Sequence, residues 1–206
     1  MKILFQGDSI TDASRDQRNY HHLGNGYPKY AAQMIREAHP DTDFEFINLG
    51  ISGNRTGQLF DRLYADAIEL QPDIISILIG INDLWHRYEK KPIATTDEQI
   101  EVNYRSILKE LRAKTNAKIM ILSPYLLDCE DKEELREDLG RILPMIRMLA
   151  NQYADVFVPL DEYFEEAMKT VPRAQYYSYD GVHPNTNGAT FIGKIYAKEI
   201  EPLLKF

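Results

Sequence analysis

The chain has 206 residues, of which 44% are hydrophobic and 27% charged, and it carries a formal net charge of −8 at pH 7. This length and composition predict one globular domain, residues 1–206, with a full core of its own. The acidic balance argues against nucleic acid and anionic membranes as partners, because both bind basic surfaces.

Strand-like and helix-like segments alternate along the whole chain, as judged from short apolar runs and from apolar residues at helical spacing. In chain order we expect a strand over 2–6, a helix over 27–38, a strand over 44–48, a helix over 59–70, a strand over 73–80, a helix over 100–111, a strand over 118–122, a helix over 135–149, a strand over 156–160, a short helix from about Asp161, and a last helix that carries Phe191, Ile195 and Ile200.

Five strands joined by helical crossovers predict a parallel sheet, because a tight turn cannot close a parallel pair. The run over 73–80 is apolar without alternation, which is typical of a central strand covered on both faces. The expected fold is therefore a three-layer α/β/α sandwich, with 2-1-3-4-5 as the leading strand order.

The compartment is also suggested by the sequence. The single cysteine, Cys129, excludes an internal disulfide, suits a reducing compartment and lies among acidic residues that would keep its thiol inert. The apolar run at Ile3–Phe5 is too short for a signal peptide, and no segment approaches the roughly 20 apolar residues of a membrane span. We expect a soluble, cytoplasmic protein; its oligomeric state stays open, a homo-oligomer included.

Four polar loops stand out because each follows a strand of the expected sheet. In a parallel sheet such loops lie at one edge, so residues far apart in sequence can converge there on one site. Each loop alone is also an ordinary turn. The four segments are Gly7-Asp8-Ser9, residues 48–54 (NLGISGN), residues 80–83 (GIND) and residues 180–185 (DGVHPN).

The chemistry that these loops could support is acyl transfer. A serine hydroxyl is a weak nucleophile and needs a base, which must itself be oriented by a third group. Asp180 and His183 are three residues apart, so the carboxylate can hold one imidazole nitrogen while the other faces Ser9. Asp8 adjoins Ser9, but neighbours on an extended chain point in opposite directions. We therefore assign Asp8 to shaping the turn, with contact to the substrate as its alternative role.

The tetrahedral intermediate of such a reaction needs donors aimed at its oxyanion. The backbone N–H groups of Ser9 and Gly53 and the side-chain amide of Asn82 could supply three. A turn glycine and a capping asparagine are the simpler interpretations of Gly53 and Asn82 taken alone.

Together the segments GDSIT, SGN, GIND and DGVHPN resemble the four ordered blocks of the SGNH hydrolases, the GDSL-like esterase/lipase superfamily. The resemblance runs from Ser9 to His183 and implies a flavodoxin-like fold and ester hydrolysis without a cofactor or metal. It assigns Ser9 as nucleophile, His183 as base and Asp180 as its partner, with Ser9, Gly53 and Asn82 as oxyanion donors.

Within that superfamily, residues 76–88 (SILIGINDLWHRY) and GISGN look most like bacterial esterases that deacetylate xylan or xylo-oligosaccharides. The expected substrate is therefore a small-molecule ester, an acetylated sugar first. Trp85, Tyr177 and Tyr179 are candidate sugar-stacking residues, although most tyrosines simply pack with their hydroxyl in water.

Three alternatives remain open at this point. A lysophospholipase or thioesterase of the same superfamily would share the whole catalytic assignment. A metal-dependent phosphoesterase could use Asp8, Asn82, Asp180 and His183 as ligands, although the chain lacks the clustered His and Asp pairs of a two-metal site. A non-catalytic binding module is disfavoured because no glycine-rich phosphate loop follows the first strand.

Overall fold

The computed structural model of the chain describes residues 1–128 and 131–205, so Cys129 and the expectation for its thiol lie outside the described residues. The strands are β1 (Lys2–Gly7), β2 (Glu45–Asn48), β3 (Ile74–Leu78), β4 (Lys118–Leu122) and β5 (Val156–Val158). The helices are α1 (Ser9–Asp12), α2 (Tyr27–Ala38), α3 (Thr56–Leu63), α4 (Ile81–Tyr88), α5 (Asp97–Lys114), α6 (Glu133–Tyr153), α7 (Leu160–Thr170), α8 (Ala174–Tyr177) and α9 (Thr186–Glu199), with a π-helical turn η1 (Tyr64–Ile68) and a 3-10 turn η2 (Glu201–Leu203).

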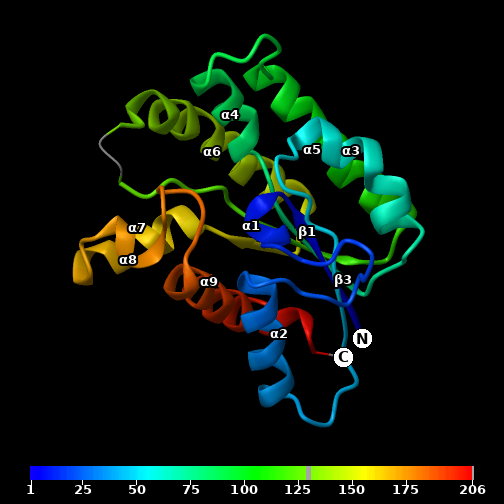
Figure 1. The fold of residues 1–206 in the computed structure, drawn as a ribbon. Coiled ribbons are helices and arrows are strands. Elements are labelled where there is room, and N and C mark those ends of the chain that lie inside the picture. The colour runs from blue at the N-terminus through cyan, green and yellow to red at the C-terminus, as the bar shows by residue number, and fades with distance from the viewer. Residues whose placement is uncertain (129–130, 206) are drawn as a thin grey trace.

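The strands form one parallel sheet in the order β2-β1-β3-β4-β5, which confirms the predicted fold class and strand order. The register pairs Gly7 with Leu78 and Leu78 with Leu122, so the three inner strands end at a common edge. The loops that follow them start from that edge (Figure 1).

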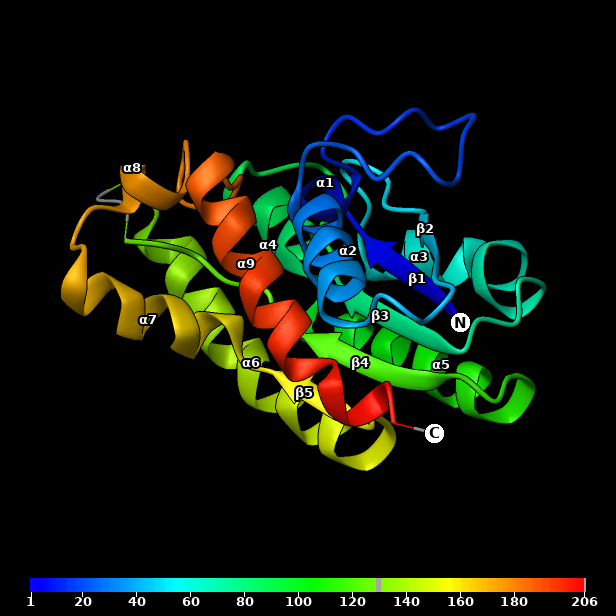
Figure 2. The ribbon, with the colours of Figure 1, turned by 90° about the horizontal axis from the view of Figure 1, so that it is seen from below.

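Helices cover both faces of the sheet, α2 and α9 on one and α3 to α6 on the other (Figure 2). Alternation along β1 sends neighbouring side chains to different layers. Phe5 packs against Tyr27 of α2 and Tyr196 of α9, with ring centroids 5.9 and 5.0 Å apart, and all three are fully buried. Gln6 faces the other layer, where its side-chain amide donates to the Asp66 carbonyl of η1 at 2.9 Å.

The short helices α1 and α4 were not predicted. Helix α1 has only four residues, and α4 begins inside GIND, where Gly and Asn suggest a loop. Gly80 makes that start possible with a φ of +121°, a conformation that L side chains rarely adopt. The helix expected over 59–70 divides into α3 and η1, and the fifth strand stops at Val158 because Pro159 leads into α7.

None of the helices in the described part of the chain combines the length and the hydrophobicity that a membrane span requires.

Candidate active site

The segment between β1 and α1 places Ser9 at the carboxyl edge of the sheet. The Asp8 side chain caps α1 by accepting a hydrogen bond from the Ile10 N–H at 3.0 Å. Gly7 is required because an added Cβ would lie 2.4 Å from the Leu78 carbonyl. The strand therefore ends in Gly-Asp-Ser because the neighbouring strand excludes a side chain at Gly7, the carboxylate starts the helix, and the hydroxyl follows at its first position.

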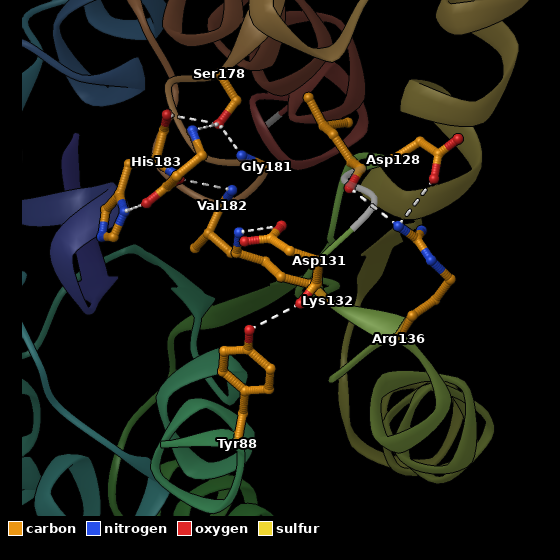
Figure 3. Close-up of polar contacts among 11 residues, drawn as sticks. Tyr88, Asp128, Asp131, Lys132, Arg136, Ser178, Gly181, Val182 and His183 are labelled. Carbon is orange, nitrogen blue, oxygen red and sulfur yellow. Dashed lines mark hydrogen bonds and ion pairs between the residues drawn. The ribbon is translucent and has the colours of Figure 1, made fainter. Parts of the chain in front are cut away.

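The turn before α9 carries Asp180 and His183, and its shape comes from hydrogen bonds within it. The Ser178 hydroxyl donates to the His183 carbonyl at 2.8 Å and accepts from the Gly181 N–H at 2.9 Å. Asp180 Oδ1 accepts from the N–H groups of Val182 and His183, at 3.0 and 2.8 Å. Figure 3 shows the imidazole of His183 pointing away from this turn, toward the end of β1.

The segment after β4 forms hydrogen bonds to the same turn. Tyr125 is fully buried, and its hydroxyl donates to the Val182 carbonyl at 2.9 Å. The Leu127 N–H donates to the Gly181 carbonyl, also at 2.9 Å. The turn is therefore fastened to the segment that follows β4 and does not depend on its own bonds alone.

Ser9, His183 and Asp180 form an unbroken chain of hydrogen bonds. Ser9 Oγ lies 3.0 Å from His183 Nε2, and His183 Nδ1 lies 2.7 Å from Asp180 Oδ2. A carboxylate only accepts, so Nδ1 carries the proton and Nε2 is left to accept from the serine hydroxyl. The His183 side chain is 46% exposed, so the pair is open to a ligand from solvent. This arrangement can remove a proton from Ser9 as its hydroxyl attacks an ester.

The electrostatics of the pair favour a protonated imidazole beside an ionised carboxylate. Partial burial opposes ionisation of Asp180, but hydrogen bonds from the His183 imidazole and from the Val182 and His183 N–H groups hold its pKa well below the ordinary range. The hydrogen bond from Asp180 raises the pKa of His183 above its ordinary 6.5, against the effect of desolvation. Protonation of His183 would therefore be favoured beside Asp180.

The Asp8 carboxyl is buried behind the serine, with 1% of the residue exposed. Burial raises its pKa to about 7, although the hydrogen bond from Ile10 and the nearby His183 act in the opposite direction. Its Oδ2 has no hydrogen-bond partner among the described residues. The role in shaping the turn fits this position, whereas burial leaves almost no surface of the carboxyl for contact with a substrate.

The three expected oxyanion donors lie on segments that contact one another. Gly53 adopts a φ of +80° with open space around its Cα, so the backbone conformation, and not crowding, requires glycine. One N–H of the Asn82 amide donates to the Asn54 carbonyl at 3.0 Å, which leaves the second for a ligand. Within residues 1–128 and 131–205, the backbone N–H groups of Ser9 and Gly53 have no hydrogen-bond acceptor, which leaves them available as donors.

Two buried carboxylates that the sequence analysis missed hold these segments together. Asp12 Oδ2 accepts from the Ser52 N–H and hydroxyl at 3.0 and 3.1 Å, which ties α1 to the loop that carries Gly53. Asp83 binds the Thr56 N–H and hydroxyl at 2.9 and 2.8 Å, which ties α4 to the start of α3. Both lie inside or beside the quoted motifs, Asp12 directly after GDSIT and Asp83 at the end of GIND.

The aromatic candidates for sugar binding lie in three different environments. Tyr177 is 6% exposed and packs against Phe164 and Phe191, with ring centroids 5.7 and 5.4 Å apart, which argues against the expected contact with substrate. Tyr179 is 76% exposed and adjoins Asp180. Trp85 is half-buried on α4, one helical turn beyond Asn82. Tyr179 and Trp85 remain candidates, and Tyr177 belongs to the core.

Among the described residues, no group of three or more His, Cys, Asp or Glu side chains is arranged to hold a metal ion.

Comparison with known proteins gives concordant matches. The model of the GDSL-like Lipase/Acylhydrolase family matches residues 5–191. An acetylxylan esterase from Geobacillus stearothermophilus is 30% identical over 207 aligned positions, covering 97% of this chain and 93% of the other. Thioesterase 1/protease 1/lysophospholipase L1 of Escherichia coli K12 is 28% identical over 158 positions, covering 77% and 68%. The crystal structure of Axe2, an acetylxylan esterase from Geobacillus stearothermophilus, matches with a TM-score of 0.89 at 28% identity, covering 97% and 93%.

Ser9→Ala should abolish hydrolysis of p-nitrophenyl acetate, because the substitution removes the only atom of Ser9 that can attack the carbonyl. The fold should persist, since alanine fits a serine position without strain. Initial rates of the purified variant, with circular dichroism to check its fold, provide the measurement. A folded variant that keeps more than about a hundredth of the wild-type kcat would refute Ser9 as the nucleophile.

The pH dependence of kcat/KM should follow the neutral form of His183, which alone can accept a proton. Because Asp180 raises the pKa of His183, activity should fall as the pH drops through a value above 6.5. Asp180→Asn should move this acidic limb to lower pH and reduce kcat by up to about ten-thousandfold. Asp8→Asn provides the comparison. If it lowers kcat more than Asp180→Asn does, Asp8 and not Asp180 is the carboxylate that assists His183.

Proposed function

The chain belongs to the GDSL-like lipase/acylhydrolase family and is a carboxylic ester hydrolase, and from this premise we propose that it removes short acyl groups, acetyl above all, from the hydroxyl groups of xylo-oligosaccharides or other sugars through Ser9, His183 and Asp180. Family membership favours this activity over the metal-dependent phosphoesterase and the non-catalytic binding module. The hydrogen-bond chain from Ser9 Oγ to Asp180 is the single observation that carries the catalytic assignment.

The proposed reaction has two half-reactions. Ser9 Oγ attacks the ester carbonyl while His183 Nε2 takes the hydroxyl proton, and the imidazolium then protonates the leaving alcohol as the acyl-enzyme forms. Water attacks the acyl-enzyme with His183 again as base, which releases the acid and restores Ser9. In both steps the N–H groups of Ser9 and Gly53 and the Asn82 amide stabilise the oxyanion.

Solved variants of Axe2 support the residue assignment. Its catalytic mutants replace a serine, an aspartate and a histidine with alanine. The aspartate and histidine of that esterase are three positions apart, as Asp180 and His183 are here. Together with the hydrogen bonds above, this agreement supports the same division of roles in this chain.

An acetylated sugar as substrate is supported by the surroundings of the open serine–histidine pair. Tyr179 presents a largely exposed ring directly beside Asp180. Trp85 shares a helix face with Asn82, because residues three apart on a helix are neighbours. An aromatic face beside an open site suits a pyranose ring, and the related acetylxylan esterase acts on such a substrate.

A lysophospholipase or thioesterase activity is the second candidate, favoured by the Escherichia coli relative and by an apolar cavity. This cavity of about 630 Å³ lies between α6, α7 and the segment after β4 and includes Leu126, Leu139, Leu143 and Phe164 in its lining. A long acyl chain would have to reach it past the turn that carries Asp180.

The two candidates differ in how rates depend on the acyl chain. We expect initial rates to be highest on acetylated xylo-oligosaccharides and, among p-nitrophenyl esters, to fall from acetate to longer chains. A serine-directed phosphonate should stop hydrolysis, and a chelator should not. Rates that rise with chain length would favour the lysophospholipase or thioesterase, and loss of activity in chelator would contradict the serine mechanism.

Tyr179→Ala should lower kcat/KM for acetylated xylo-oligosaccharides several-fold more than for p-nitrophenyl acetate, which has no sugar to contact. The loss of an aromatic contact is worth about 0.5–1.5 kcal/mol, which corresponds to this factor. Trp85→Ala should show the same selectivity. The ratio of the two kcat/KM values is the measurement.

Tyr64→Ala is the matched control, since Tyr64 is 58% exposed on η1 and lies near Lys114 at the end of α5. It should change neither substrate's kcat/KM. Equal losses on both substrates in Tyr179→Ala would remove the support for a sugar-binding ring.

A further inference from the structure

Arg62 lies on the last turn of α3, and its guanidinium is inserted between the ends of two strands. Nη2 donates to the Gly7 carbonyl at 3.1 Å, and Nη1 donates to the Leu49 carbonyl at 2.8 Å. The side chain is 15% exposed, so these bonds are made largely out of water. One planar group thus binds the backbone just before Ser9 and just before the loop that carries Gly53.

The same guanidinium reaches Asn54, the residue that follows Gly53. Arg62 Nε donates to Asn54 Oδ1 at 2.8 Å. The backbone carbonyl of Asn54 in turn accepts from the Asn82 amide at 3.0 Å. Arg62 therefore holds the side chain of Asn54, the residue bonded to Gly53. The Asn54 carbonyl in turn orients the side-chain amide of Asn82.

The position of Arg62 is itself set by η1. Asp66 Oδ2 accepts from Arg62 Nη1 at 2.8 Å, and the Asp66 carbonyl accepts from Gln6 Nε2 at 2.9 Å. Gln6 Oε1 also accepts from Arg62 Nη1 at 2.8 Å. The π-helical turn thus turns both polar groups of Asp66 toward the end of β1, and a carboxylate offsets the buried positive charge.

We propose that Arg62 is a positioning residue that aligns all three oxyanion donors. The inference rests on the proposed function, because those donors matter only if an oxyanion forms. Arg62 reaches the segment of Ser9 through Gly7, the segment of Gly53 through Leu49 and Asn54, and Asn82 through the Asn54 carbonyl. Among the side chains described above, Arg62 alone donates to main-chain carbonyls in both the Ser9 and the Gly53 segments, and its link to Asn82 runs through Asn54.

The consequence for catalysis is selective. The donors are needed mainly when negative charge develops on the carbonyl oxygen, so misalignment raises the barrier more than it weakens substrate binding. Lysine cannot replace Arg62, because an ammonium has three donors on one atom and lacks the planar fork that spans these acceptors. Loss of Arg62 should therefore lower kcat and leave KM nearly unchanged.

The test compares Arg62→Lys, Arg62→Ala and Asn54→Ala on p-nitrophenyl acetate. The Arg62 variants should lose about a hundredfold in kcat, the scale of a small misplacement of catalytic groups, with KM changed less than about threefold. Asn54→Ala removes only the bond that leads to Gly53 and Asn82, so it should lose about tenfold and remain folded even if the Arg62 variants do not. Guanidinium added to Arg62→Ala should restore part of kcat.

Arg112→Ala is the matched control for lost stability. Arg112 also donates to two carbonyls, those of Tyr153 and Ala117, and to the Asp155 carboxylate, but at the amino ends of β4 and β5. Its variant should lower the melting temperature and leave kcat unchanged. If Asn54→Ala keeps the wild-type kcat, or if Arg62→Lys loses no more kcat than Arg112→Ala, the proposal is overturned.

A double-mutant cycle separates positioning from a general structural effect. If Asn54 acts on the same machinery as Asn82, Asn54→Ala should cost a smaller factor in the Asn82→Ala background than in the wild type. Equal factors in both backgrounds would contradict the proposal. Failure of the proposed function looks different, because wild-type enzyme would then resist the phosphonate and Ser9→Ala would stay active.

Discussion

The common carboxyl edge of the parallel sheet is the constraint on which the site depends. Ser9 and His183 are 174 residues apart in sequence, yet their side chains lie within 3.0 Å of each other. The register that brings Gly7 level with Leu78 starts the loops after β1 and β3 from one edge, and α9 returns the chain so that its preceding turn lies there too. A parallel sheet thus gathers distant loops without any one of them being long.

Loops that meet at one edge must also be held in position, and largely buried polar side chains hold them by hydrogen bonds. Asp12, Arg62 and Asp83 each bind backbone groups of a neighbouring loop. Burying a charge costs free energy unless its hydrogen bonds are satisfied, so each of these groups holds its loop in the geometry that satisfies them. The hydroxyl and imidazole stay open to solvent while the groups that align them do not.

The alternation of elements and the gathering of the site loops at one edge could be predicted because they depend on periodicity and chain order, whereas the strand order was expected only because it is a common order for doubly wound sheets. Helix α4 could not be predicted, since Gly80 and Asn82 are turn formers and only the φ of +121° at Gly80 shows that a helix starts there. Tyr177 and Tyr179 are two positions apart, yet Tyr177 packs on Phe164 and Tyr179 is exposed to solvent. The difference arises because α8 ends at Tyr177, so Tyr179 lies beyond the helix. Arg62 was missed because the carbonyls of Gly7 and Leu49 and the amides of Gln6 and Asn54 leave no pattern in the sequence, and its pairing with Asp66 four residues on is common on helix surfaces.

The buried Asp8 explains how a very short helix can carry the proposed nucleophile and still leave a free N–H for the proposed oxyanion site. A helix has N–H groups at its start without partners inside the helix. The Asp8 carboxylate takes the N–H of Ile10, and the Asp8 carbonyl takes those of Thr11 and Asp12. Only the N–H of Ser9 itself is left over, beside its own hydroxyl. The cap is made by a buried carboxyl, and this burial raises the pKa of Asp8 to about 7. A cap that accepted from the Ser9 N–H would have removed this donor.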